Sequence, residues 1–142
     1  MLSIDVNVLI YAHREEFHNH PRFKSWLEAT VNAPNPYGLS DLVLSAFLRI
    51  VTNPRVFPSP TPLDQAIGFV GDLRGRKNCV VLTPGPRHWE IFLELCLKGG
   101  AEGSLVSDAY HAALAIESGC EWVTTDRDYA RFPDLRWRHP FD

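Results

Sequence analysis

Cysteine is scarce in this sequence, whose 142 residues include only Cys79, Cys96 and Cys120. An odd number of widely separated cysteines argues against a disulfide framework or a zinc site, and predicts reduced, buried thiols. No apolar run approaches the roughly 20 residues that a membrane-spanning helix needs. No basic segment followed by an apolar one indicates a secretory signal. We therefore expect a cytoplasmic protein that does not associate with membranes.

A strong basic excess is also missing. The 14 Lys and Arg residues are outnumbered by 17 Asp and Glu residues, which gives a formal net charge of −3. Non-specific nucleic-acid binders usually show the opposite balance. The basic residues are nevertheless clustered, at 74–77 and at 127–138, and this placement is compatible with a basic rim around an acidic pocket.

The sequence does contain an alternation of short apolar strands and amphipathic helices. Strands are expected at 2–4, 79–82, 122–124 and near 135–138, and helices are expected at 21–31, 41–52, 61–73, 87–97 and 105–117. The stretch 32–38, which contains Pro, Asn and Gly, predicts only a break. The alternation and the length predict one α/β domain over residues 1–142, a three-layer α/β/α sandwich with a mainly parallel sheet.

Two local predictions accompany this assignment. Thr61 to Asp64 resembles a capping box, in which the Thr side chain would cap the following helix. In the helix at 87–97, the spacing of the large apolar residues predicts that Trp89, Phe92, Leu93 and Leu97 face inward.

Carboxylates follow two of the expected strands. Asp5 comes directly after the first strand, and Asp126 and Asp128 come after the strand at 122–124, while Asp108 lies near the start of an Ala-rich helix. In open α/β sheets, ligands bind beyond the carboxyl ends of the strands. The alternative for Asp5 and Asp108 is a purely local role at a helix start, where Asp is favoured.

Several carboxylates in one pocket repel each other, so without a cation at least one of them tends to hold a proton. A divalent cation removes this conflict. Oxygen ligands without nearby Cys or paired His favour Mg²⁺ or Mn²⁺ over Zn²⁺, and such ions suit phosphate chemistry.

Four segments carry a resemblance to a known family. They are Asp5-x-Asn7, FLRIVTNPRVF at 47–57, SDAYHAALAIESG at 107–119 and TTDRDYARFPDLRW at 124–137. In this order and spacing they resemble the PIN-domain family, and within it the VapC-type toxins of bacterial toxin–antitoxin pairs. The resemblance extends from Leu2 to about Pro140.

The resemblance implies a flavodoxin-like α/β/α fold, a homodimer and a Mg²⁺-dependent endoribonuclease. By position, Asp5 and Asp108 resemble the main metal ligands of the family and Asp126 the third acid. The implied reaction is hydrolysis of an RNA phosphodiester by a metal-activated water, leaving a 3′-hydroxyl and a 5′-phosphate. Asp128 would be a further acid of the catalytic set, with Asn7 and Thr124 as orienting groups.

One position departs from the family. Many members have a Glu at the position that aligns with Ala46, and Ala cannot bind a metal. Asp41 lies five residues earlier, about 140° around a helix, and is expected to support the site only by reaching in from the helix start. Arg49 and Arg127 are candidate contacts to RNA phosphates. The resemblance also implies a cognate antitoxin protein that covers the acidic pocket.

The sequence can be compared with the requirements of three other functions. A haloacid-dehalogenase-type phosphohydrolase would need a second Asp where Asn7 stands, and Asn has no proton to donate as an acid. A receiver domain would need paired acids at the first strand and a Lys near the last, and neither is evident. Ala46 and the acidic balance leave one further alternative, a catalytically weak or inactive PIN-like module that binds RNA or a protein.

Overall fold

The computed structural model describes residues 1–142 and contains a five-stranded sheet in the order β3-β2-β1-β4-β5. All four pairs of neighbouring strands are parallel. The strands are β1 (Leu2–Ile4), β2 (Tyr37–Ser40), β3 (Cys79–Leu82), β4 (Glu121–Val123) and β5 (Trp137–Arg138). The predicted parallel sheet is confirmed.

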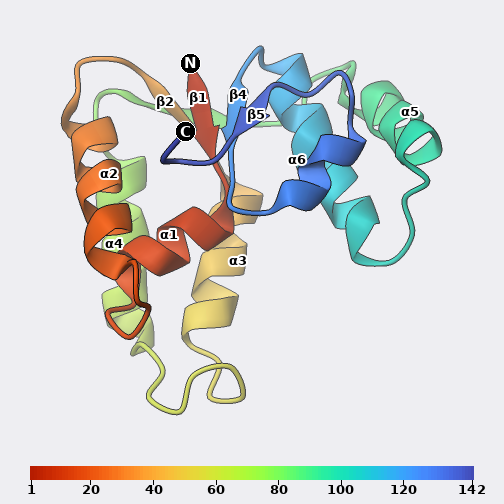
Figure 1. Ribbon diagram of the computed structural model, residues 1–142. Helices are drawn as coiled ribbons and strands as arrows, with labels where there is room; N and C mark the ends of the chain where they lie inside the picture. Colours follow the sequence, from red (N-terminus) through yellow and green to blue (C-terminus); the bar gives the residue numbers. More distant parts are fainter.

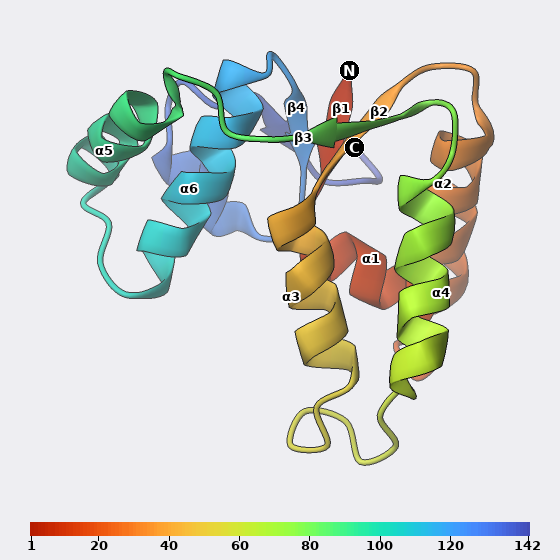
Figure 2. The same cartoon turned by 180° about the vertical axis from the view of Figure 1, so that it is seen from behind.

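Helices lie on both sides of this sheet, as Figures 1 and 2 show from opposite directions. In both views α2 and α4 lie on one side, and α5 and α6 lie on the other. The helices are α1 (Val6–His13), α2 (His20–Asn32), α3 (Asp41–Val51), α4 (Leu63–Arg74), α5 (His88–Gly99) and α6 (Ser104–Glu117), with the short 3-10 helix η1 (Arg127–Arg131). The arrangement is a three-layer α/β/α sandwich.

The strand order determines where a ligand site can form. From the central β1 the chain first adds β2 and β3 on one side, and later adds β4 and β5 on the other. In open α/β sheets the crevice at such a switch point collects functional groups. Because Ile4 of β1 pairs with Val123 of β4, the residues that follow these strands, Asp5 and Thr124, emerge side by side.

Strand β2 is absent from the sequence prediction, and the expectation of a mere break at 32–38 is wrong there. All four residues of β2 are buried between β1 and β3. The segment YGLS has no β-branched residue, which is why its composition does not indicate a strand. Gly38 allows close packing, because a Cβ at this position would lie 2.7 Å from Cδ1 of Leu82.

Two helix predictions also need correction. Thr61 does not cap α4, whose N-cap is Pro62 without a side-chain hydrogen bond; the Thr61 hydroxyl instead contacts His13 and Arg14. In α5 Phe92 is buried as predicted, but the buried face is centred about one residue earlier, and Trp89, Leu93 and Leu97 are 63%, 44% and 85% exposed. The buried residues are His88, Ile91, Phe92 and Leu95. One residue is about 100° of helix rotation, enough to turn a stripe away from the core.

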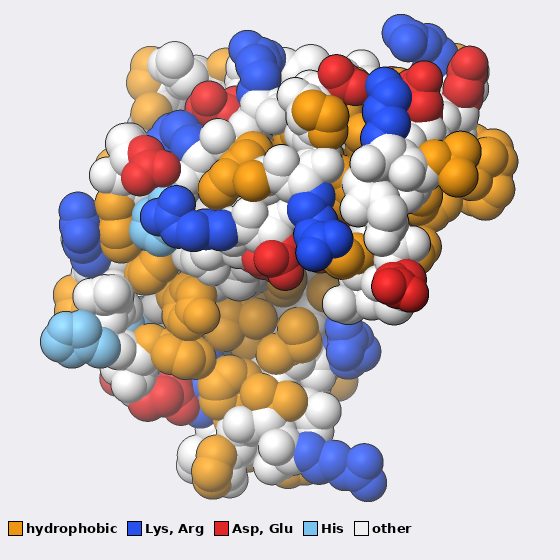
Figure 3. Space-filling model, turned by 45° about the vertical axis from the view of Figure 1, so that its right-hand side comes forward, with side chains coloured by type: hydrophobic (Ala, Val, Ile, Leu, Met, Phe, Trp, Pro, Cys, Tyr) orange, Lys and Arg blue, Asp and Glu red, His pale blue; other side chains and the backbone are white.

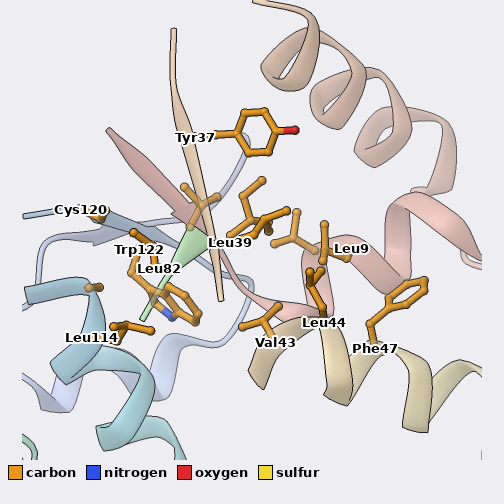
Figure 4. Packing of buried hydrophobic residues seen from close by; sticks show 14 of the residues in the cluster. Leu9, Tyr37, Leu39, Val43, Leu44, Phe47, Leu82, Leu114, Cys120 and Trp122 are labelled. Atoms are coloured by element: carbon orange, nitrogen blue, oxygen red, sulfur yellow. The ribbon is translucent and has the colours of Figure 1, made fainter. Parts of the chain in front are cut away.

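The core lies between the sheet and the helices on each side. Figure 4 shows Leu39 of β2 near Leu9 of α1, with Val43 and Leu44 of α3 beside them. Ser40 ends β2 and caps α3, its hydroxyl accepting a hydrogen bond from the Val43 amide at 3.1 Å. This cap turns the chain directly from the strand into the helix that borders the candidate site.

No helix combines the length and the apolar character needed to cross a membrane. The three cysteines are unpaired; Cys120 is buried as predicted, whereas Cys79 and Cys96 are half-buried.

The buried Tyr37 hydroxyl donates a 2.5 Å hydrogen bond to the carbonyl of Leu73, tying β2 to the end of α4. Replacing Tyr37 with Phe is expected to lower the free energy of unfolding by about 1 kcal/mol, because the carbonyl loses its partner in a dry environment. Urea titration followed by circular dichroism measures this change. An unchanged midpoint and slope would mean that this bond adds nothing to stability.

Candidate active site

A cavity of about 310 Å³ opens at the carboxyl ends of the strands. It is lined by residues from β1–α1, α3, α6 and the segment after β4, namely Asp5, Val6, Asn7, Leu42, Ala46, Arg49, Ile50, Ser107, Asp108, His111, Asp126 and Tyr129. The three carboxylates that the sequence predicts as metal ligands, Asp5, Asp108 and Asp126, therefore share one cavity.

Asp5 has two roles in this structure. It is the N-cap of α1, and its Oδ1 accepts a hydrogen bond from the Val6 amide at 2.7 Å. Its Oδ2 accepts from the Thr124 hydroxyl at 2.6 Å and from the Asn7 amide at 3.1 Å. The capping alternative and the cavity position thus hold together, and three donors of the chain hold this carboxylate in place.

Asn7 and Thr124 connect the ends of β1 and β4. The Asn7 side chain donates to the Thr124 hydroxyl at 3.4 Å and accepts from the Thr125 amide at 3.3 Å. The Thr124 hydroxyl in turn accepts from the Asp126 amide at 3.0 Å. These contacts orient the carboxylates without placing any additional charge in the cavity.

Asp108 projects from the first turns of α6, and the Tyr129 hydroxyl donates to its Oδ1 at 3.4 Å. The buried Ala109, Ala112 and Ala113 bring this helix close to its neighbours. Tyr129 comes from η1, which begins after its N-cap, Asp126. One aromatic hydroxyl therefore links the helix that carries Asp108 to the segment that carries Asp126.

The carboxylates affect each other's ionisation. Burial raises the pKa of Asp5 to about 6, and the charges of Asp108 and Asp126 add to the rise against the hydrogen bonds from Thr124 and Val6. The pKa of Asp108 is also raised, first by burial and then by the charges of Asp126 and Asp128. The pKa of Tyr129 is raised by burial and by the charges of Asp5, Asp108 and Asp126, so its hydroxyl keeps its proton and donates.

Three polar residues of the cavity were not predicted from the sequence: Ser107, His111 and Tyr129. His111 lies three residues after Asp108, and that spacing places both on one helix face. The sequence therefore contained a signal that could have identified His111 as a cavity residue. The ring of His111 stacks on Trp122 at 5.6 Å, and burial lowers its pKa to about 4. His111 therefore presents a neutral imidazole. Ser107 and Tyr129 have no distinguishing signal beyond belonging to the quoted segments.

Helix α3 forms one wall of the cavity, with Leu42, Ala46, Arg49 and Ile50. Ala46 lines the cavity, so the longer Glu that the family resemblance implies at this position would enter it. In this chain the wall is mostly apolar, and Arg49 is the cation that faces the acids from it.

Four predicted residues lie outside the cavity lining. Thr124 is buried next to it and contacts Asp5 through its hydroxyl; the other three lie toward the surface. Asp41 does not reach in from the helix start, because its side chain is 62% exposed and forms an ion pair with Arg74 at 2.8 Å. The prediction that Asp41 supports the site is therefore wrong. Asp128 is exposed, and only its amide contacts the site residue Asp126, at 2.9 Å. Arg127 is exposed at the start of η1. Both follow Asp126 at a turn that directs them outward.

The residues present fit a hard divalent cation. The donor set consists of carboxylate, hydroxyl and amide oxygens, which suit Mg²⁺ or Mn²⁺, and a cation would offset the repulsion that raises the pKa values of Asp5 and Asp108. No three Asp, Glu, His or Cys side chains form a ready-made metal cluster. Mg²⁺ usually keeps several waters and is held through one or two carboxylates, which Asp5, Asp108 and Asp126 can supply.

Acidic and basic side chains are mixed on the surface of the protein. Figure 3 shows one face, with a carboxylate near its middle and Lys or Arg side chains on both sides, above a broad hydrophobic area.

Comparison with known proteins agrees with the fold. The PIN domain pattern matches residues 2–135, and the chain therefore belongs to the PIN domain family. It is 44% identical over 142 residues to VapC ribonuclease Mb2897 of Mycobacterium bovis, covering 100% of this chain and 97% of that protein. Ribonuclease VapC25 of Mycobacterium tuberculosis is 39% identical over 140 residues, with 99% of both chains covered.

A solved structure shares the fold at low sequence identity. It is VapBC2 from Rickettsia felis bound to a DNA fragment from their promoter, with a TM-score of 0.68, 17% identity and 97% of each chain covered.

Proposed function

We propose that this protein is a Mg²⁺-dependent endoribonuclease, the toxin of a toxin–antitoxin pair. The observation that supports this most directly is the meeting of Asp5, Asp108 and Asp126, which come from three distant segments, in one cavity. The full-length similarity to VapC ribonucleases supports RNA as the substrate.

Asp5, Asp108 and Asp126 would hold the metal. Bound there, Mg²⁺ would lower the pKa of a water and offset charge on the phosphodiester. Asn7 and Thr124 fix the orientation of Asp5 through hydrogen bonds, and the Tyr129 hydroxyl does so for Asp108. Arg49, on the opposite wall, would contact a phosphate of the RNA, because its guanidinium suits phosphate oxygens. The proposed products carry a 3′-hydroxyl and a 5′-phosphate.

Metal removal tests this proposal. The purified chain is expected to fragment total RNA when Mg²⁺ is present in excess, and to lose this activity in excess EDTA. Gel electrophoresis measures the fragments, and sequencing of their 5′ ends identifies the cleaved sites. Activity that is the same in EDTA would contradict the metal-dependent reaction.

A cognate antitoxin and a homodimer belong to the same proposal. The Rickettsia felis structure that shares this fold is of VapBC2 bound to promoter DNA, and this likeness supports an antitoxin partner here. An Arg from such a partner would find three carboxylates in the cavity. The exposed Trp89, Leu93 and Leu97 of α5 form an apolar stripe of the kind that a second copy would cover.

A catalytically weak module that binds RNA or protein remains the second candidate. One observation favours it: the cavity wall carries Ala46, which has no ligating group, at the position where the family resemblance implies a Glu. RNA binding without cleavage in the Mg²⁺ assay would support this function over the first.

A further inference from the structure

A second pocket, with aromatic walls, lies beside the candidate active site. Its volume is about 330 Å³, and it shares no lining residue with the cavity of the carboxylates. The lining comes from α1, the loop before α2, α2 itself, the segment after β4 and the C-terminal segment, and consists of Tyr11, Phe17, His18, Asn19, Phe23, Thr125 and His139.

The two cavities are separated by a single stretch of chain. Thr125 lines the aromatic pocket and Asp126 lines the acidic cavity, and consecutive Cα atoms are only about 3.8 Å apart. The Thr125 amide also donates to Asn7, a residue of the acidic cavity, at 3.3 Å. The two cavities are therefore immediate neighbours, and an extended ligand that crosses this stretch of chain would reach both.

The walls of this pocket suit a flat ring. Tyr11 packs against Phe17 with ring centroids 4.7 Å apart and against Phe23 at 5.0 Å. Tyr11 and Phe17 are half-buried, so part of each ring stays open to the pocket. Unpaired RNA bases stack on such aromatic side chains, and rings that are already packed lose little freedom when a base binds.

The polar groups of the pocket suit a nucleic acid. No acidic side chain lines it, while His18 and His139 do. Asn19 precedes α2 but makes no capping hydrogen bond with its side chain, so its amide is free to donate to and accept from a base edge. The Arg22 guanidinium lies 4.0 Å from the Phe141 ring, which packs 4.7 Å from Phe23, and adds positive charge nearby.

The largest cavity of the protein lacks these features. It has a volume of about 510 Å³, contains no hydrophobic residue, and lies around Arg14 and Thr61. Arg14 is already bonded to Glu16, Thr61 and the Ser59 carbonyl. Size alone therefore does not single out a ligand site here, whereas open aromatic surface next to the carboxylates does.

We propose that the pocket of Tyr11, Phe17 and Phe23 binds one unpaired nucleobase of the RNA, next to the scissile phosphate. This inference rests on the proposed RNA-cleaving function and adds a base-binding subsite to it. The subsite would select substrates in which a base beside the cleaved bond is free to leave its stack, as in a loop or an unpaired segment.

The test compares Phe17→Leu, which keeps an apolar side chain but removes the aromatic face, with Asn19→Ala at an exposed position. Phe69→Leu is the matched control, because this half-buried aromatic residue lies on α4 and lines neither the aromatic pocket nor the acidic cavity. Thermal melting establishes that each variant is folded. Fluorescence anisotropy in EDTA then measures the affinity for a random-sequence RNA heptamer, and the rate of cleavage in Mg²⁺ is measured separately.

We expect Phe17→Leu to bind RNA about tenfold more weakly, since stacking on one base contributes about 1–3 kcal/mol, and Asn19→Ala to show a smaller loss. Phe69→Leu should bind RNA as the original protein does. With cleavable RNAs that carry one abasic nucleotide at successive positions, a single position should lower kcat/KM about tenfold. Phe17→Leu should cause no further loss on that RNA.

The outcomes separate this subsite from the proposed function. RNA binding that is weakened by Phe17→Leu without any cleavage would support the subsite and overturn the nuclease. Cleavage with unchanged affinity in both pocket variants would overturn the subsite alone, and so would an equal Phe17→Leu effect on every abasic RNA. Variants that keep RNA affinity but lose a protein partner would assign the pocket to that protein. Absence of any RNA binding would overturn both.

Discussion

Replacing Asp5 with Asn is expected to lower the rate of RNA cleavage on the order of 1,000-fold. A metal at a phosphodiester contributes several kcal/mol to the transition state, and each 1.36 kcal/mol corresponds to a tenfold change in rate. Asn keeps the size of the side chain but removes the charge that three crowded carboxylates would use to hold Mg²⁺. Asp108→Asn should have a similar effect, because Asp108 lines the same cavity.

Initial cleavage rates on one RNA at saturating Mg²⁺ measure these losses. The matched control is Asp134→Asn, which removes an exposed carboxylate that pairs with Lys98 and should leave the rate unchanged. In cells, expression of the original chain should arrest growth, and Asp5→Asn should relieve the arrest. Equal toxicity of the Asp5→Asn protein would show that hydrolysis at this site is not the cause.

The second large effect concerns stability as a function of pH. The pKa of Asp5 is raised by burial from the ordinary 3.8 to about 6 in the folded protein, so the folded state binds this proton more tightly than the unfolded state does. The stabilisation from Asp5 is therefore fully present below about pH 4 and is lost as pH rises to about 6. The difference between these pKa values corresponds to about 3 kcal/mol.

We therefore expect the stability of the original protein relative to Asp5→Asn to fall by about 3 kcal/mol between pH 4 and pH 7 without metal. Urea unfolding of both proteins at each pH measures this difference, and the comparison removes contributions from acids common to both, such as Glu16 and Asp41, whose pKa values are lowered by Arg partners. Mg²⁺ should stabilise only the original protein at pH 7. Parallel pH profiles would contradict the buried, crowded state of Asp5.

Much of the site could be predicted from the order of residues, because the positions concerned follow strands. Asp5 and Asp126 follow segments whose pattern predicts buried strands, and parallel strands bring their carboxyl ends to one edge. Asp108 was predictable from its place in an Ala-rich helix and from the family resemblance. His111 could have been found by its helical spacing from Asp108.

Other features depend on contacts that are distant in the sequence. Strand β2 forms because Gly38 fits against Leu82, although its four residues show no strand preference. The rotation of α5 about its axis depends on which face of the helix the rest of the chain covers, so Trp89 and Leu97 stay exposed to solvent. The position of Asp41 also depends on a distant contact, because its hydrogen-bond partner Arg74 lies 33 residues away.

The sequence by itself determined the α/β alternation, the family and the acids that follow β1 and β4, since these depend on local pattern and on chain order. Only the tertiary structure decided which residues share the cavity with those acids, that Asp41 is excluded from it, and that an aromatic pocket lies one residue away from Asp126. The physical reason is that burial and charge repulsion depend on distances in space, which the spacing along a chain does not specify.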